Sequence, residues 1–279
     1  MSGSRSGFRA GVIALAMAAA LPLAACSRPV EAHDDAMGTR TLAWSGGDRL
    51  FVGLNADVRY VQGPAATAVI TGPADEIGDI VVQDGVIRHE RDRWGWEWWE
   101  PWKWPRWRRG SWRSDVQIVV TAPGVSDAGV SGSGHLDLGR LAQDRLDLEV
   151  SGSGAIDVAG QIKALQVSIS GSGSAQLDQV NVGDMSADLS GSGLIKASGA
   201  ASTLHLGISG SGAADMGALT VQDLDAHLSG SGSATLSPKQ TADVGVSGSG
   251  SVHLLTEPQH LSTHRSGSGA IVHPGGSED

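Results

Sequence analysis

The sequence has little cysteine, few aromatic residues and little helical periodicity. Its single cysteine among 279 residues excludes an intramolecular disulfide. Aromatic residues make up 4% of the chain, and no long stretch repeats apolar residues at helical spacing. These features argue against a large helical enzyme core. The 40 glycines are typical of low complexity, but 40% of the residues are hydrophobic, which is enough for a sizeable core.

Common catalytic and metal-binding motifs are also missing. The patterns GxSxG, GxxxxGK, HExxH and GxGxxG do not occur. The recurring SGSGxxD looks like a calcium-binding repeat, but its acid falls one position late and only at Asp137, Asp157 and Asp215. Four histidines near the C-terminus are irregularly spaced, and we interpret them as a solvated end rather than a metal site: His253, His260, His264 and His273. We predict no enzyme activity, no cofactor and no bound metal.

The N-terminal sequence is typical of an export signal. Arg5 and Arg9 precede an apolar run over residues 10–20, which is too short for a permanent transmembrane helix. The run ends in Leu23-Ala24-Ala25-Cys26, which resembles the lipobox of a bacterial lipoprotein. We predict a signal peptide over residues 1–25 and an acyl chain such as palmitate on Cys26.

The anchor would hold the protein on the bacterial cell envelope. Ser27 after the cysteine favours the outer membrane over inner-membrane retention in a Gram-negative cell. The alternative is an ordinary signal peptide, cut after Ala32. We predict that residues 26–40 form a polar tether between the lipid and the fold.

Charge is distributed unevenly along the mature chain. Loss of Arg5 and Arg9 changes the net charge from −10 to −12 (−10 − 2). Residues 88–113 carry eight basic and four acidic side chains, a net +4, which leaves −16 for the remainder. An acidic body argues against nucleic-acid binding.

Eight of the nine tryptophans lie in the basic segment. A hairpin turning at Glu100 within residues 93–112 would pair tryptophans across the two strands. This ribbon could be a lid over the fold, or an exposed element that stacks on sugar rings or enters a lipid interface. In the second case the candidate ligand-binding residues are Trp94, Trp96, Trp98, Trp102, Trp104 and Trp107.

The C-terminal half is a repeat array. Eight copies of SGSG begin at spacings of 20, 19, 20, 19, 20, 18 and 19 residues, starting at Ser131. Counted from the first serine of each copy, odd positions are mostly apolar and even positions polar or small, which is the period of a β-strand. A fixed period near 20 predicts stacked β-coils. Continuing the alternation through the motif predicts that both glycines point inward at a tight corner and both serines outward.

Each period also needs a second turn, which absorbs the variation in length. We place it in segments such as 139–145 and 159–164. Upstream of the array, strand-like runs occur at 50–61, 68–71, 80–87 and 116–121. The predicted organisation is therefore N-terminal β rungs over 41–130, the SGSG array over 131–273 and a polar tail over 274–279.

Two upstream segments carry a family resemblance. The run Ala56–Gly63, and the run Asp115–Thr121 followed by Pro123-Gly124-Val125 and then SGSG, are similar to the GIN domain. That family is known as the head of auto-transporter adhesins. The resemblance covers about residues 48–273. It implies a right-handed, single-stranded parallel β-helix that looks like pectin lyases without their catalytic residues.

The predicted function is that of a non-catalytic, adhesin-like lipoprotein of the cell envelope. Its partners would be the membrane, through the lipid, and a glycan or envelope surface. The alternative is a periplasmic carbohydrate- or envelope-binding module that uses the tryptophan ribbon. A third hypothesis, a polysaccharide-active enzyme on the same scaffold, would need a cleft of clustered carboxylates, which the outward positions do not provide.

Overall fold

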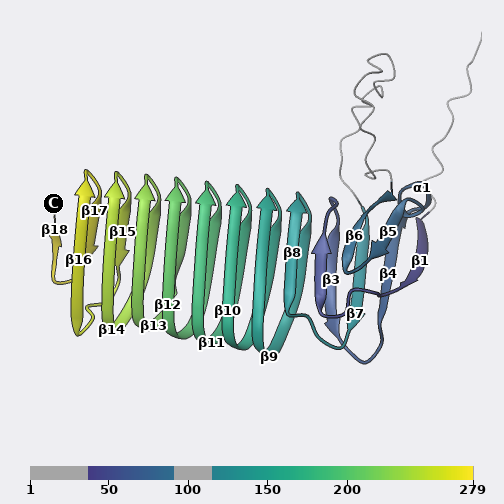
Figure 1. Cartoon of the computed structure of the whole chain (residues 1–279), viewed down its shortest axis with the longest axis horizontal. Helices are drawn as coiled ribbons and strands as arrows, with labels where there is room; N and C mark the ends of the chain where they lie inside the picture. The colour runs from purple at the N-terminus through teal and green to yellow at the C-terminus, as the bar shows by residue number, and fades with distance from the viewer. Residues whose placement is uncertain (1–36, 91–114, 279) are drawn as a thin grey trace, which may run out of the picture. The chain divides into compact units, whose positions relative to one another are not determined.

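A computed structural model describes residues 37–90 and 115–278. These residues form a parallel β-solenoid of about eight turns with a repeat spacing near 19 residues, which confirms the predicted fold class. Strands β9 to β14 follow one another in chain order, side by side (Figure 1).

The described part of the chain contains one short helix, α1 (Ala74–Ile77). Its strands are β1 (Met37–Ala43), β2 (Arg49–Val52), β3 (Asp57–Gln62), β4 (Thr67–Pro73), β5 (Ile80–Gln83), β6 (Val86–His89), β7 (Gln117–Ala122), β8 (Asp127–Gly132), β9 (His135–Gly152), β10 (Ala155–Gly171), β11 (Ser174–Gly191), β12 (Leu194–Gly210), β13 (Ala213–Gly230), β14 (Ser233–Gly248), β15 (Ser251–Leu254), β16 (His260–Gly267), β17 (Ala270–His273) and β18 (Gly276–Glu278).

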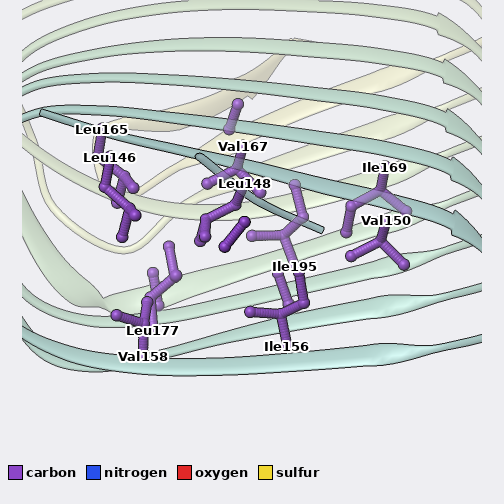
Figure 2. Close-up of a cluster of buried hydrophobic side chains, with 14 of the residues drawn as sticks. Leu146, Leu148, Val150, Ile156, Val158, Leu165, Val167, Ile169, Leu177 and Ile195 are labelled. Carbon is purple, nitrogen blue, oxygen red and sulfur yellow. The ribbon is translucent and has the colours of Figure 1, made fainter. Parts of the chain in front are cut away.

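The core consists of apolar columns that run from rung to rung. The parallel register sets Val150 against Ile169 and Leu146 against Leu165, and all four side chains are buried. Figure 2 shows these columns facing a second set, in which Val158 lies near Leu177. The odd positions predicted to point inward are therefore the core, because each apolar side chain is covered by its counterparts in adjacent rungs.

The SGSG corner differs from the prediction in one respect. Only the second glycine of each motif is buried. The first glycine is exposed or half-buried and has a φ between +107° and +120°, a backbone conformation that favours glycine. The serines point outward as predicted. Backbone hydrogen bonds join successive corners, as from Ser192 N–H to the Gly171 carbonyl at 2.8 Å.

The predicted second turn is a continuation of the strand. Residues 159–164 lie inside β10 and pair in parallel with both neighbouring rungs. Shifts of register, such as the one between Ala159 and Gly160, absorb the differences in length. Ile162 and Val182, paired there, are buried. The segment thus adds a further buried column, since paired backbone allows its apolar side chains to point inward.

The N-terminal rungs are less regular. The predicted run 50–61 is divided into β2 and β3, and the run 80–87 is a hairpin of β5 and β6 that turns at Asp84 and Gly85. Strand β1 begins at Met37, inside the segment predicted as a tether, and pairs antiparallel with β4. Arg40 Nη1 donates to the carbonyls of Ile77, Gly78 and Ile80 at 2.9–3.2 Å, which fixes α1 against β5.

In the C-terminal rung, only one of the two strands has its outer edge paired with another described strand. Strand β18, in the segment predicted as a tail, pairs antiparallel with β17. Strand β16 pairs with β14, and no other described strand covers it. Inward positions on β16 hold Thr263 and the exposed Arg265, whose Nη1 donates to the Gly269 carbonyl at 3.4 Å. A charged residue at an open strand edge opposes edge-to-edge association.

We expect Arg265→Leu to fold normally and to self-associate, because leucine at this edge exposes an apolar strand. Sedimentation velocity of the variant and the wild type checks this. A monodisperse variant with the same sedimentation coefficient as the wild type would show that Arg265 does not protect the edge.

An acid-sensitive contact joins β17 and the turn after it to the loop between β15 and β16. Glu257 Oε2 lies 3.1 Å from His273 Nδ1 and accepts a hydrogen bond from Gly275 N–H at 2.9 Å. The His273 contact and then the Gly275 hydrogen bond hold the pKa of Glu257 below its usual value. The folded state therefore favours the carboxylate, and this stabilisation is present above the ordinary glutamate pKa and is lost as pH falls through the lowered one.

We expect the β17–β18 hairpin to exchange its amide hydrogens faster at pH 3 than at pH 6, after correction for intrinsic exchange. Glu257→Gln should raise exchange at pH 6 and abolish most of the pH dependence, because glutamine keeps the shape without the charge. Hydrogen exchange read by mass spectrometry measures both. A pH dependence that persists unchanged in Glu257→Gln would assign it to another group.

Candidate functional site

The strands that precede the SGSG corners present two outward columns, two and four residues before the first serine. In β12 to β16 these columns gather histidine, aspartate and glycine. We call this surface, with the adjoining corner serines, the histidine face. It comprises His205, Gly207, Asp225, His227, Asp243, Gly245, Ser262, His264, Ser209, Ser229, Ser247 and Ser266.

A carboxylate between two imidazoles lies at its centre. Asp225 Oδ1 is 3.1 Å from His227 Nε2, and Asp225 Oδ2 is 3.4 Å from His205 Nδ1. Parallel register places His205 directly across from Asp225 on the next rung. The shorter of the two contacts, between Asp225 and His227, joins two residues of the same strand. The contact orients the His227 ring and turns its Nδ1 toward Gly245, where an added Cβ would lie 2.7 Å from that atom.

Glycine in the outer column opens grooves along the face. Gly207 and Gly245 lie in register on either side of His227, and each occupies the floor of a groove. The groove at Gly207 has a volume of about 320 Å³ and the groove at Gly245 about 410 Å³. A third, of about 170 Å³, lies between Arg145 and His205. The grooves at Gly207 and Gly245 lie over the same two outward columns, whereas the third lies over positions four to six residues before the first serine and shares only His205 with the histidine face.

The strands after the corners carry a different polar cluster. His135 Nε2 lies 2.9 Å from Asp157 Oδ2, and Arg59 Nε lies 3.4 Å from Asp137 Oδ2. Asp137 also accepts a hydrogen bond from Gly139 N–H. Two of the three acids that a calcium repeat would use, Asp137 and Asp157, are thus engaged by protein groups. These contacts tie β3 to β9 and β10, so we interpret the cluster as structural.

Several predicted site residues lie outside the described part of the chain. These are the lipidation site Cys26 and the candidate ligand-binding residues Trp94, Trp96, Trp98, Trp102, Trp104 and Trp107. The four C-terminal histidines do not form one group in the structure. His273 contacts Glu257, whereas His264 lies on the histidine face. Within residues 37–90 and 115–278, no group of three or more potential ligands is arranged to hold a metal ion.

The central residues of the histidine face were not among the predicted sites. His205, Asp225 and His227 are unremarkable along the sequence, since they come from two repeats. The pattern that groups these residues in one column appears only when the repeats are aligned by the first serine of SGSG. The position two residues before it then reads Asp188, Gly207, His227, Gly245 and His264.

The chain matches a known family. The model of a family described as "Putative auto-transporter adhesin, head GIN domain" matches residues 48–178 and 162–258. No curated protein matches the chain.

Several solved structures have a similar fold. A putative lipid binding protein from Parabacteroides distasonis aligns with a TM-score of 0.73 at 20% identity, over 85% of this chain and 96% of that one. A putative adhesin from the same species gives 0.67 at 16%, over 86% and 97%. A putative adhesin from Bacteroides fragilis gives 0.54 at 20%, over 86% and 97%. At these identities the likeness establishes the fold alone.

Proposed function

The chain belongs to the GIN head-domain family of auto-transporter adhesins, and from this premise we propose that it is a non-catalytic binding domain of the cell envelope that holds an extended polymer along its histidine face. The family and the similar structures are named as adhesins or as a lipid-binding protein, not as enzymes. Adhesion requires a surface that binds without reacting.

One observation carries the proposal: the grooves at Gly207 and Gly245 repeat over the same two outward columns along one side of the solenoid. Repetition suits a polymer, because successive units of the ligand can occupy successive grooves, and many weak contacts then act together. Exposed imidazole and hydroxyl groups supply both hydrogen-bond donors and acceptors. A polysaccharide offers complementary hydroxyl groups at regular intervals.

Binding to immobilised bacterial and host polysaccharides tests the proposal. We expect the triple variant His205→Ala/His227→Ala/His264→Ala to lose most of the binding of the wild type. The matched control, His135→Ala/His253→Ala, removes imidazoles from the strands after the corners and should bind normally. Equal binding by both variants and the wild type would place recognition elsewhere.

The tryptophan-rich segment is the second candidate for this role. Eight tryptophans with interspersed arginines provide stacking surfaces for sugar rings. A deletion of residues 94–112 in the same assay separates the two hypotheses. Loss of binding only in the deletion would assign recognition to the segment rather than to the histidine face.

We further propose that Cys26 carries the lipid that holds the domain on the outer membrane. The lipobox-like sequence and the absence of any other cysteine support this. No helix among the described residues has the length and apolar character needed to cross a bilayer. Mass spectrometry of the membrane fraction is expected to find an acylated N-terminal cysteine. A mature N-terminus at His33 would overturn lipidation.

A further inference from the structure

The outward column two residues before the first serine alternates between large and small residues along the histidine face. Parallel register places Asp188, Gly207, His227, Gly245 and His264 beside one another on successive rungs. The two glycines are two rungs apart, which is about 9.6 Å for a rung spacing of about 4.8 Å. Each glycine lies in the floor of a groove, and the exposed His227 lies between the two grooves and lines both.

The neighbouring column at the corner repeats on every rung. It consists of the first serine of each motif, and these serines are exposed and line the same two grooves: Ser190, Ser209, Ser229, Ser247 and Ser266. The surface therefore offers a hydroxyl group, which both donates and accepts hydrogen bonds, at every rung and a groove at every second rung. A ligand that fits both columns has units about one rung long that alternate in orientation.

An extended two-fold polysaccharide, such as a chain of cellulose or chitin, has this geometry. One sugar unit advances such a chain by close to one rung, and each unit is turned by half a turn relative to the unit before it. The exocyclic hydroxymethyl group of every second sugar therefore points to the same side of the chain. Grooves at every second rung can hold these groups, and the sugar between them presents its narrower edge to His227. A helical chain such as amylose curves away from a straight row of grooves.

We propose that the histidine face binds an extended two-fold polysaccharide parallel to the solenoid axis, with alternate sugars in the grooves at Gly207 and Gly245. The inference rests on the proposed function, since it names the class of polymer that the same face holds. Once one groove is occupied, binding in the second is intramolecular, so a chain that reaches both grooves binds more tightly than a chain that reaches one. The serine row hydrogen-bonds the sugar hydroxyl groups along the same path.

Calorimetric titration with cellohexaose, chitohexaose and maltohexaose tests the inference, because maltohexaose contains the same sugar as cellohexaose in a helical chain. We expect the wild type to bind at least one of the two extended hexasaccharides about tenfold more tightly than maltohexaose, the effect of one additional groove. Gly207→Thr and Gly245→Thr each fill one groove, so each should lose most of this preference. Ser168→Thr adds a methyl group to the same column outside both grooves and should behave as the wild type.

Both glycine variants are expected to fold. Neither glycine has a positive φ, and an added Cβ would meet only the end of a side chain, Asp188 Oδ1 at Gly207 or His227 Nδ1 at Gly245, at 2.7 Å in each case. These side chains are exposed and can rotate away. Thermal unfolding and sedimentation check the fold and the dispersity of each variant.

A wild type that binds maltohexaose as tightly as the extended hexasaccharides, or that binds none of the three, would overturn the inference and leave the histidine face as a polymer-binding surface. A preference that persists unchanged in both glycine variants would also overturn it. If His205→Ala/His227→Ala/His264→Ala binds the preferred hexasaccharide as the wild type does, the proposed function fails as well.

Discussion

Replacement of Gly191 by alanine is expected to lower the free energy of unfolding by about 3 kcal/mol. Gly191 has a φ of +115°, which alanine adopts only at a cost of about 1–3 kcal/mol. An added Cβ would also lie 2.5 Å from the Gly171 carbonyl oxygen, which itself accepts the hydrogen bond that joins the two corners. The backbone would have to move to relieve this contact, so the strain cannot be removed by a change of rotamer.

Equilibrium urea unfolding measures the loss, and the neighbouring residues supply the controls. Gly193→Val should also destabilise, by about 1–3 kcal/mol, because its Cβ would lie 2.8 Å from Ile169 Cγ2 in the core. Ser192→Ala should cost less than about 1 kcal/mol, since its side chain is exposed. A serine variant less stable than both glycine variants would mean that the inward and outward positions are inverted.

Ile195→Ala is expected to cost about 4 kcal/mol, near the upper end for a core isoleucine. Ile195 is fully buried, and parallel register places Ala175 and Ala214 on its two sides. Figure 2 shows its side chain in the same column as Ile156, among the packed columns of the core. Ala234 follows Ala214 in the same column, so truncation would leave four alanines in a row, and the rigid rungs on either side cannot close the space.

The same unfolding assay includes two comparisons. Ile195→Val removes one methyl group and should cost about 1 kcal/mol. Lys196→Ala, at the adjacent exposed position, should change stability by less than about 0.5 kcal/mol. A cost for Ile195→Ala below about 1.5 kcal/mol would indicate that the solenoid can contract around the missing side chain.

The fold was predictable because one pattern recurs in every repeat. Alternating apolar residues identify Val150 and Ile169 as core residues, and the structure confirms this. The same alternation wrongly assigned the first glycine of each corner to the interior. Period-two counting assumes extended backbone, whereas Gly171 and Gly191 have positive φ values that turn the chain outward without changing the count.

The prediction of a second turn in each repeat was wrong for a related reason. Variable length in segments such as 159–164 is typical of a loop, and the sequence does not reveal that a shift in register can absorb it. The candidate site was the least predictable part. His205 and Asp225 are 20 residues apart and meet only because adjacent rungs align them. The grooves at Gly207 and Gly245 are open because glycine has no side chain to fill them.

NMR of the histidine rings is the sharpest test of recognition by the histidine face. In protein labelled at histidine, a bound polysaccharide is expected to shift the ring signals of His205, His227 and His264. The signals of His135 and His253, on the strands after the corners, should stay in place and serve as internal controls. Shifts at His135 and His253 with none at His205, His227 and His264 would contradict the claim.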